Sequence, residues 1–238
     1  MSALEALLVV QEHDTTVEQL RYRRTNLPQR AELDALRREQ VATDAALASV
    51  QARHDTLVRD EQRLDDEAST HEVKAADMEK RLYSGTVTAP KELQSMQAEV
   101  EQFRRLRDQI EDRELELMEQ REVIDADLER LRVQHVEQVA RAATLAEQIG
   151  AAEVEIDALL AAELAARAES ATPVSAEMLG VYEDRRAKAK GVGVARLIGL
   201  TCQGCHLTVP AAEADALRHG PPDTLAFCDN CGAILVAS

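Results

Sequence analysis

Four cysteines near the end of the chain carry the most specific chemistry in the sequence. They form two C-x-x-C pairs, Cys202 with Cys205 and Cys228 with Cys231, and 22 residues separate the pairs. The two-residue gap lets the backbone curl so that both thiolates of a pair face one ion, and four thiolates complete the tetrahedral shell of zinc. Because such a shell leaves no place for water or substrate, the sequence predicts one structural Zn²⁺ and no catalytic metal.

The segment around these cysteines, residues 197–238, is predicted to be a C4 zinc ribbon. The alternative, a pair of redox dithiols, expects a C-x-x-C at a helix start beside a strand-helix-strand pattern, and that context is absent. His206 is a fifth candidate ligand, although four cysteines suffice. Short strands are expected over residues 192–200, 206–209, 224–227 and 233–236, with a helix over 211–219. So small a module needs its metal, since a structural zinc ion contributes about 10 kcal/mol to folding.

A basic stretch precedes the ribbon and is the candidate nucleic-acid contact. Twelve residues, 185–196, contain no acid and five cations: Arg185, Arg186, Lys188, Lys190 and Arg196. These cations could hold phosphate, and Tyr182 and Phe227 could add stacking to bases. The alternative is a solvated helix end whose cations complement the helix dipole and neighbouring carboxylates. The residues alone do not decide between these two interpretations.

The overall composition excludes several classes of protein. The chain has 238 residues, with 44 acidic and 28 basic side chains, a net charge of −16 and only five aromatic residues. This charge opposes long-range attraction to nucleic acid or to an anionic membrane, so any such contact must be local. No apolar run is long enough to span a membrane and no signal peptide is evident, so a cytoplasmic location is expected. No nucleophile and base pair, phosphate loop or paired-carboxylate pocket stands out, so we predict no enzyme and no small-molecule substrate.

Two long heptad seams position the cysteines. Between residues 3 and 170 the only helix breakers are Pro28, Gly85, Pro90 and Gly150. Apolar residues repeat in alternating steps of three and four along residues 33–82 and again along 93–166. The two seams mirror each other: Leu82 with Leu93, Met78 with Met96, Leu64 with Ile110, Leu57 with Leu117, Val50 with Ile124 and Leu47 with Leu128 all give position sums of 174 or 175. An antiparallel hairpin produces this invariant, whereas a parallel dimer of separate helices, the alternative, does not.

The sequence thus predicts a mainly α fold, a long antiparallel coiled-coil helical hairpin followed by a small zinc-ribbon domain. The predicted divisions are a hairpin over residues 1–170, a connecting helix with basic linker over 171–196, and the ribbon over 197–238. The hairpin turns near residues 83–90, where Gly85 takes a left-handed conformation, Thr88 caps the second helix and Pro90 opens it. His54 and His71 interrupt the seam and are expected to set register rather than bind metal.

The N-terminal helix has two predicted arrangements. Leu20 with Ile156 and Val17 with Leu159 give sums of 176, so this helix can continue along the same partner, with a kink near residues 27–28. Alternatively, Pro28 turns it back as a third strand of the bundle. The sequence leaves both arrangements open.

These features together resemble a known family. Residues at the turn, before the ribbon and in the two cysteine pairs are similar to those of the bacterial C4-type zinc-ribbon coiled-coil hairpin proteins. The similar segments outside the cysteine pairs are Leu82-Tyr83-Ser84-Gly85, Pro90-Lys91-Glu92-Leu93-Gln94, Tyr182-Glu183-Asp184-Arg185-Arg186 and Gly193-Val194-Ala195-Arg196. The resemblance covers essentially the whole chain. It implies a non-enzymatic adapter whose ribbon end binds nucleic acid or transcription proteins, with the four cysteines as zinc ligands. Many such ribbons have Gly directly after the second cysteine of a pair, whereas here His206 follows Cys205.

The function predicted from the sequence is that of an adapter. Its ribbon end would bind RNA or DNA and its arm a protein partner, for example in the transcription or translation machinery, in transcriptional or post-transcriptional regulation. The alternative is a protein-only scaffold or chaperone-like adapter without nucleic-acid contact. Secondary-channel regulators of RNA polymerase also present a coiled-coil hairpin, but they carry acidic residues at the tip. Residues 84–89 hold no Asp or Glu, so that mechanism is not expected.

Overall fold

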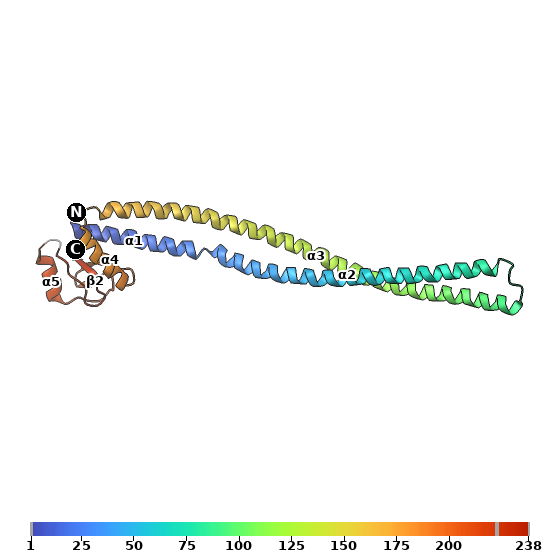
Figure 1. Cartoon of the computed structure of the whole chain (residues 1–238). Coiled ribbons are helices and arrows are strands. Elements are labelled where there is room, and N and C mark those ends of the chain that lie inside the picture. The colour runs from blue at the N-terminus through green and yellow to red at the C-terminus, as the bar shows by residue number, and fades with distance from the viewer. Residues whose placement is uncertain (1, 222–223, 238) are drawn as a thin grey trace. The chain divides into compact units, whose positions relative to one another are not determined.

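The computed structural model of the chain describes residues 2–221 and 224–237. Its helices are α1 (Ala3–Thr25), α2 (Pro28–Leu82), α3 (Pro90–Ala171), α4 (Ala176–Lys188) and α5 (Ala211–His219), and its strands are β1 (Val194–Ile198), β2 (Thr201–Cys202) and β3 (Ile234–Ala237). The predicted fold, a long helical hairpin with a small C-terminal module of short strands and one short helix, is confirmed (Figure 1). Over the described residues, no helix combines the length and apolarity needed to cross a membrane.

The chain divides into two compact units. One, here called the base unit, comprises Met1–Ala31 and Ala146–Ser238, and the other, here called the arm, comprises Glu32–Leu145. The arm therefore consists of most of α2, the turn, and the first two thirds of α3. The base unit combines α1, the last part of α3, α4 and the zinc-ribbon segment.

The arm is an antiparallel coiled coil with the predicted register. Leu64, Ala68 and Ile110 form a buried cluster against which Leu117 packs, as the mirrored seam requires. The rings of His71 and Phe103 lie 6.0 Å apart between centroids, and their positions also sum to 174. In Figure 1, α2 and α3 run side by side to the turn that joins them. The antiparallel hairpin is thus a single-chain arrangement in which each seam buries the other.

The turn of the arm follows the predicted chemistry except at its cap. Gly85 has φ of +75°, the left-handed conformation that glycine adopts without steric cost. Helix α3 begins at Pro90, and the carbonyl of Ala89 accepts bonds from the amides of Glu92 and Leu93. Ala89, and not the predicted Thr88, is therefore the N-cap residue. Proline at the first helical position makes the preceding residue the cap, whatever its side chain.

In the base unit, α1 lies against the last part of α3, as the continuing seam predicted. Arg24 pairs with Asp157 at 2.8 Å and His13 with Glu163 at 2.7 Å, so the helices are antiparallel. Helix α1 ends at Thr25 and α2 begins at Pro28, so the expected kink is a break in the helix. The alternative that Pro28 turns α1 back on itself is excluded.

One of the predicted pairs along α1 is wrong. Val17 is buried at 2% exposure, but its predicted partner Leu159 is 44% exposed. The ion pairs between these helices do not share one position sum, with 181 for Arg24 with Asp157 and for Asp14 with Arg167, and the predicted 176 for His13 with Glu163. The exposure of Leu159 shows that it lies beside the seam and not in it.

The ribbon contains a three-stranded sheet in the order β2-β1-β3, with β1 antiparallel to β2 and parallel to β3. The predicted helix over residues 211–219 is confirmed as α5. The predicted strands over 206–209 and 224–227 are wrong, since these segments contribute only the isolated bridges of Thr208 with Thr201 and of Phe227 with Ile234. Both segments adjoin the cysteine pairs, whose turns bend the backbone away from the sheet after a single bridge.

The two faces of this sheet belong to two different cores. Side chains alternate along a strand, so Val194, Ile234 and Val236 share one face, and Leu197 and Leu235 share the other. The first set packs with Leu4, Leu7, Val10 and Tyr182 from α1 and α4. The second set packs with Cys202, Val209, Ala214 and Cys228 around the cysteine cluster. The sheet thus joins the cysteine cluster to the helices of the base unit.

Candidate metal centre and its anchorage

The structure brings the four predicted ligands together. The sulfur atoms of Cys202, Cys205, Cys228 and Cys231 all lie within 4.8 Å of one another, with 4.0 Å from Cys202 to Cys231 and 3.8 Å from Cys205 to Cys228. A tetrahedron with zinc–sulfur bonds of about 2.3 Å has edges of about 3.8 Å. The sulfur set therefore fits one zinc ion, which these residues would hold as a closed structural site. Among the described residues, no other group of three or more His, Cys, Asp or Glu side chains has such an arrangement.

The two cysteine pairs have the same backbone geometry. The amide of His206 donates to the carbonyl of Cys202 at 2.8 Å, and the amide of Gly232 donates to that of Cys228 at 2.7 Å. Both residues are left-handed, with φ of +59° for His206 and +73° for Gly232. The position after the second cysteine thus requires a positive φ in both pairs. His206 adopts it at a cost of about 1 kcal/mol, which glycine does not incur.

Burial and mutual repulsion make two free thiols of this cluster, those of Cys202 and Cys231, reluctant to ionise. Burial raises the pKa of Cys202, and it raises the pKa of Cys231 to about 12. Burial acts in the same direction on Cys228, but the amides of Cys231 and Asn230 donate to its sulfur and leave its pKa lowered. Four thiolates this close together require a cation, and zinc supplies the charge that stabilises them.

The basic stretch is largely engaged in contacts within the chain. The Arg185 guanidinium lies over the Phe227 ring, 4.3 Å from its centroid. Arg186 pairs with Glu18 and lies 3.7 Å from Asp14, and Lys188 pairs with Asp184 at 2.7 Å. Lys190 and Arg196 are exposed and form no ion pair with any described residue. The five candidate residues therefore do not form one open cationic surface.

The expected stacking by aromatic side chains is also corrected. Tyr182 is fully buried, so it is not accessible to a base. Phe227 is half-buried and already carries Arg185 on its face. Tyr182 instead belongs to a buried group of polar side chains that the sequence analysis did not identify.

We call this group the polar clamp; its members are Gln11, Asp14, Arg167, Tyr182 and Arg186. Arg167 donates to both Asp14 carboxylate oxygens, at 2.8 and 3.2 Å, and the Tyr182 hydroxyl donates to one of them at 2.7 Å. The Asp14 side chain is only 5% exposed. The clamp therefore joins α1, α3 and α4 through one buried carboxylate whose oxygens have several donors.

Gln11 extends the clamp to the start of the ribbon. Its side-chain oxygen accepts from the Gly193 amide at 2.7 Å, and its nitrogen donates to the Gly191 carbonyl at 2.8 Å. A Cβ atom at Gly193 would lie 2.7 Å from the Tyr182 ring, so only glycine allows this close approach. The chain that enters β1 is thus held by α1 on one side and α4 on the other.

The charges around Asp14 favour its ionised form. Burial opposes ionisation, but the hydrogen bonds from Arg167 and Tyr182 and the charges of Arg167 and Arg186 outweigh it, so the pKa of Asp14 is lowered. Burial and the Asp14 charge raise the pKa of Tyr182, which therefore stays a neutral donor. The sequence did contain a signal for this site. Gln11 and Asp14 interrupt the apolar stripe formed by Leu7, Val10 and Val17, where a polar residue must find a buried partner.

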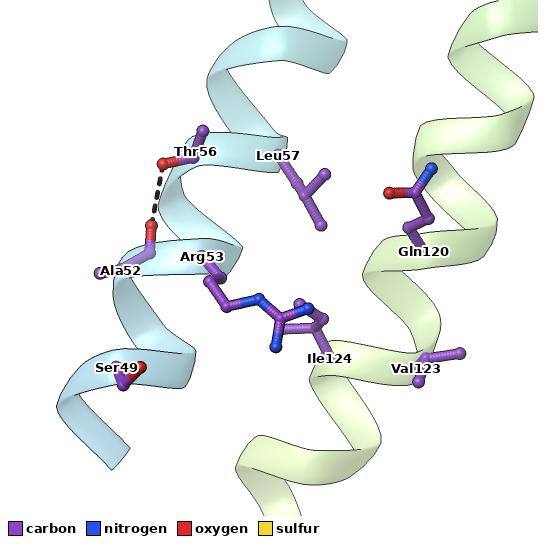
Figure 2. Close-up of a pocket in the computed structure, with 8 residues that line it drawn as sticks. All are labelled: Ser49, Ala52, Arg53, Thr56, Leu57, Gln120, Val123 and Ile124. Carbon is purple, nitrogen blue, oxygen red and sulfur yellow. Dashed lines mark hydrogen bonds between the residues drawn. The ribbon is translucent and has the colours of Figure 1, made fainter. Parts of the chain in front are cut away.

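The arm has a separate surface feature, an apolar groove of about 710 Å³ between α2 and α3. In Figure 2, Leu57 and Ile124 lie between the two helices, with Arg53 and Gln120 beside them. The remaining lining residues are Ser49, Ala52, Thr56 and Val123. The alanine and serine side chains are too short to fill the space. Arg53 is the one charged residue in the lining, so the groove offers apolar contact and no acid-base pair.

Comparison with known proteins agrees with this architecture. Two relatives from Mycobacterium tuberculosis, Uncharacterized protein MT2288 (strain CDC 1551 / Oshkosh) and Uncharacterized protein Rv2229c (strain H37Rv), are each 28% identical over 238 residues, covering 97% of this chain and 94% of theirs. The fold is similar to that of a Mycobacterium smegmatis protein, with a TM-score of 0.85 at 22% identity and complete coverage of both chains. It is also similar to CT398 from Chlamydia trachomatis, with a TM-score of 0.71 at 18% identity, covering 99% of this chain and 98% of that one.

Family models divide the chain between the helical part and the cysteine cluster. The CT398-like coiled coil hairpin domain matches residues 10–190, and the C4-type zinc ribbon domain matches residues 201–235. The second match includes all four cysteines, in agreement with a single structural zinc ion. The first covers most of the chain, including the arm and the clamp residues. The protein therefore belongs to the CT398-like coiled-coil hairpin family and carries a C4-type zinc ribbon.

Proposed function

We propose that this chain is a non-enzymatic adapter that binds a protein partner through its coiled-coil arm, with the zinc ribbon as a structural module. The observation that carries the proposal is the internal use of the basic stretch. Arg186 and Lys188 form ion pairs within the chain, and Arg185 stacks on Phe227. Cations already paired with carboxylates add little attraction for phosphate, so the ribbon end is a weaker phosphate site than its sequence suggests.

Two further observations support an adapter without catalytic activity. The four sulfurs fit a closed zinc shell, and a closed shell offers no position at which water or substrate could bind the metal. The groove of about 710 Å³ on the arm is lined mainly by apolar and small side chains, which suit protein contact better than acid-base chemistry.

Nucleic-acid binding is the second candidate function. Lys190 and Arg196 favour it, because both are exposed and form no ion pair with a described residue. They are two charges, whereas tight binding to a nucleic-acid backbone usually neutralises several phosphates. A contact through these residues would therefore be weak and strongly dependent on salt.

The two functions are separated by a pulldown from native lysate with and without nuclease. The wild-type chain is compared with a Lys190→Glu, Arg196→Glu variant, which leaves the clamp and the cysteine cluster intact. The adapter proposal expects the same protein partners in all four conditions. Loss of every partner on nuclease treatment and in the variant would overturn it and establish the nucleic-acid function. Reversal of Arg185 or Arg186 is unsuitable for this purpose, because it also disrupts internal contacts.

A further inference from the structure

The turn of the arm differs in charge from the helices that lead to it. Residues 80–91, here called the apex, contain three cations, Lys80, Arg81 and Lys91, and no acid. All three side chains are exposed, and none has a carboxylate partner within ion-pairing distance among the described residues. Further down the arm some cations are paired, for example Arg104 with Glu79 at 2.7 Å, and others, such as Arg105 and Arg113, are single charges surrounded by acidic residues. The apex therefore presents unpaired positive charge.

Helix electrostatics explain only part of this arrangement. Lys80 and Arg81 lie in the last turn of α2, where the helix dipole favours cations. Lys91 lies in the first turn of α3, where the dipole disfavours a cation. No stabilising contact among the described residues offsets its position. The contacts among the described residues thus give Lys91 no structural role at the apex.

The apex also displays an aromatic side chain on an ordered turn. Tyr83 is 78% exposed, in a chain with only five aromatic residues. The Ser84 hydroxyl donates to the Arg81 carbonyl at 2.7 Å and lies 2.7 Å from the Thr86 hydroxyl, which fixes the turn. No atom lies within 4 Å of a Cβ built at Gly85, so the outer side of the turn is open. Exposed tyrosine and arginine on an ordered scaffold are typical of residues that dominate protein interfaces.

The charge of the neighbouring helices restricts what can bind here. Residues 55–79 and 99–129, which lead to and from the apex, contain 21 acids and 8 bases. A long polyanion laid across the apex would be repelled by these helices on either side. A short acidic segment that contacts only the apex would not be repelled in this way. Charge complementarity therefore favours a compact acidic protein element over nucleic acid.

We propose that the apex is a docking site for an acidic segment of a partner protein, whose carboxylates pair with Lys80, Arg81 and Lys91 beside the exposed face of Tyr83. This proposal rests on the adapter function and specifies where on the arm the partner binds. The apex acts as the contact point, and the acidic helices below it exclude other polyanions.

The test is photo-crosslinking from the apex of the full-length protein. A benzoylphenylalanine replaces the exposed Thr88, and crosslinked segments from nuclease-treated native lysate are identified by mass spectrometry. We expect crosslinked partner segments rich in Asp and Glu, reduced about tenfold by the Lys80→Glu, Arg81→Glu, Lys91→Glu variant. Tyr83→Ala should also reduce the yield of these crosslinked segments. The matched control, Arg38→Glu, Arg105→Glu, Arg113→Glu, carries the same charge change lower on the arm, outside the apolar groove, and should retain the crosslinks.

The outcomes separate this proposal from the adapter function. If partners copurify equally with the wild type and with the apex variant, the adapter function stands and the apex proposal is overturned. If crosslinks form only in lysate that has not been treated with nuclease, and the crosslinked molecule is nucleic acid, the apex proposal is overturned as well. If no protein partner copurifies with the wild type and none crosslinks, both proposals fail. Unchanged helical circular dichroism in each variant shows that a loss of crosslinking is not a loss of folding.

Discussion

The base unit and the arm use polar side chains in opposite ways. In the base unit, one carboxylate, that of Asp14, is 5% exposed and is contacted by Arg167, Arg186 and Tyr182. In the arm, Glu61 is the one carboxylate described as buried, and other ion pairs are open to solvent, as in Arg104 with Glu79, whose side chains are 49% and 39% exposed. Buried convergent contacts fix the geometry of a site, whereas exposed pairs contribute little and are exchangeable. The base unit is therefore specified by particular residues and the arm by its apolar repeat.

The largest expected effect distinguishes the two units by their need for metal. Removal of zinc with a chelator, or Cys202→Ser, should unfold the ribbon, because a structural zinc site contributes about 10 kcal/mol. Hydrogen exchange should then show loss of protection in β1, β3 and α5, while the amides of the arm stay protected and serve as an internal control. Full protection of the ribbon without zinc would contradict the assignment of the cysteines.

The next effect tests the clamp. Asp14→Ala should destabilise the base unit by about 3 kcal/mol, because it removes the buried carboxylate that accepts hydrogen bonds from both Arg167 and Tyr182. Urea unfolding followed by hydrogen exchange in α1 and α4 measures this change. The control is Asp34→Ala, which removes an exposed carboxylate 3.7 Å from Arg37 in the arm and should change stability by less than about 0.5 kcal/mol. Equal effects of the two substitutions would show that the polar clamp contributes no more to stability than an exposed ion pair does.

The lowered pKa of Asp14 predicts that the stability of the base unit depends on pH. The pKa of Asp14 is lowered in the folded protein, so its contribution is fully present above the unfolded pKa of about 3.9 and is lost as pH falls through the lower folded value. The stability difference between wild type and Asp14→Asn should therefore shrink below about pH 4. Zinc dissociation at acidic pH affects both proteins and cancels in this difference. A difference that stays constant down to pH 3 would rule out this titration.

A smaller effect is expected at the cysteine pairs themselves. His206 has a positive φ, so His206→Gly should stabilise the zinc-loaded ribbon by about 1 kcal/mol. The opposite change in the other pair, Gly232→Ala, should destabilise it by a similar amount. Competition with a chromophoric chelator measures both variants. A weaker zinc affinity for His206→Gly would show that the histidine side chain itself contributes to the site.

The smallest effect is expected in the arm. Arg104→Ala removes an exposed ion pair and should change the stability of the arm by less than about 1 kcal/mol. This difference between wild type and variant should disappear in high salt, which screens exposed charges. Thermal unfolding of the wild type and the variant at low and high salt tests this. A loss of several kcal/mol would remove the contrast between the arm and the base unit.

Sequence patterns sufficed for the arm because its structure repeats. The mirrored seam placed Leu64 beside Ile110, and Gly85 and Pro90 located the turn. The cysteine spacing likewise brought four sulfurs to one point. These features depend on local geometry or on a periodic pattern, both of which are visible in a single chain.

The contacts of the base unit were not predictable in the same way. The polar clamp joins Gln11 and Asp14 to residues more than 150 positions away, and no periodicity relates them. The parallel pairing of β1 with β3 and the burial of Tyr182 also depend on how distant segments meet. The residues alone did not decide whether the basic stretch holds phosphate or pairs with carboxylates, because Asp14 and Glu18, the acidic partners of Arg186, belong to the first helix.

The most direct test of this account is the metal content of the native chain. Full-length protein purified under reducing conditions is analysed by elemental and native mass spectrometry, and its thiols are titrated before and after chelation. We expect one zinc ion per chain and four cysteines that react only after the metal is removed. A folded chain without zinc, whose two cysteine pairs pass reversibly between dithiol and disulfide, would contradict the account.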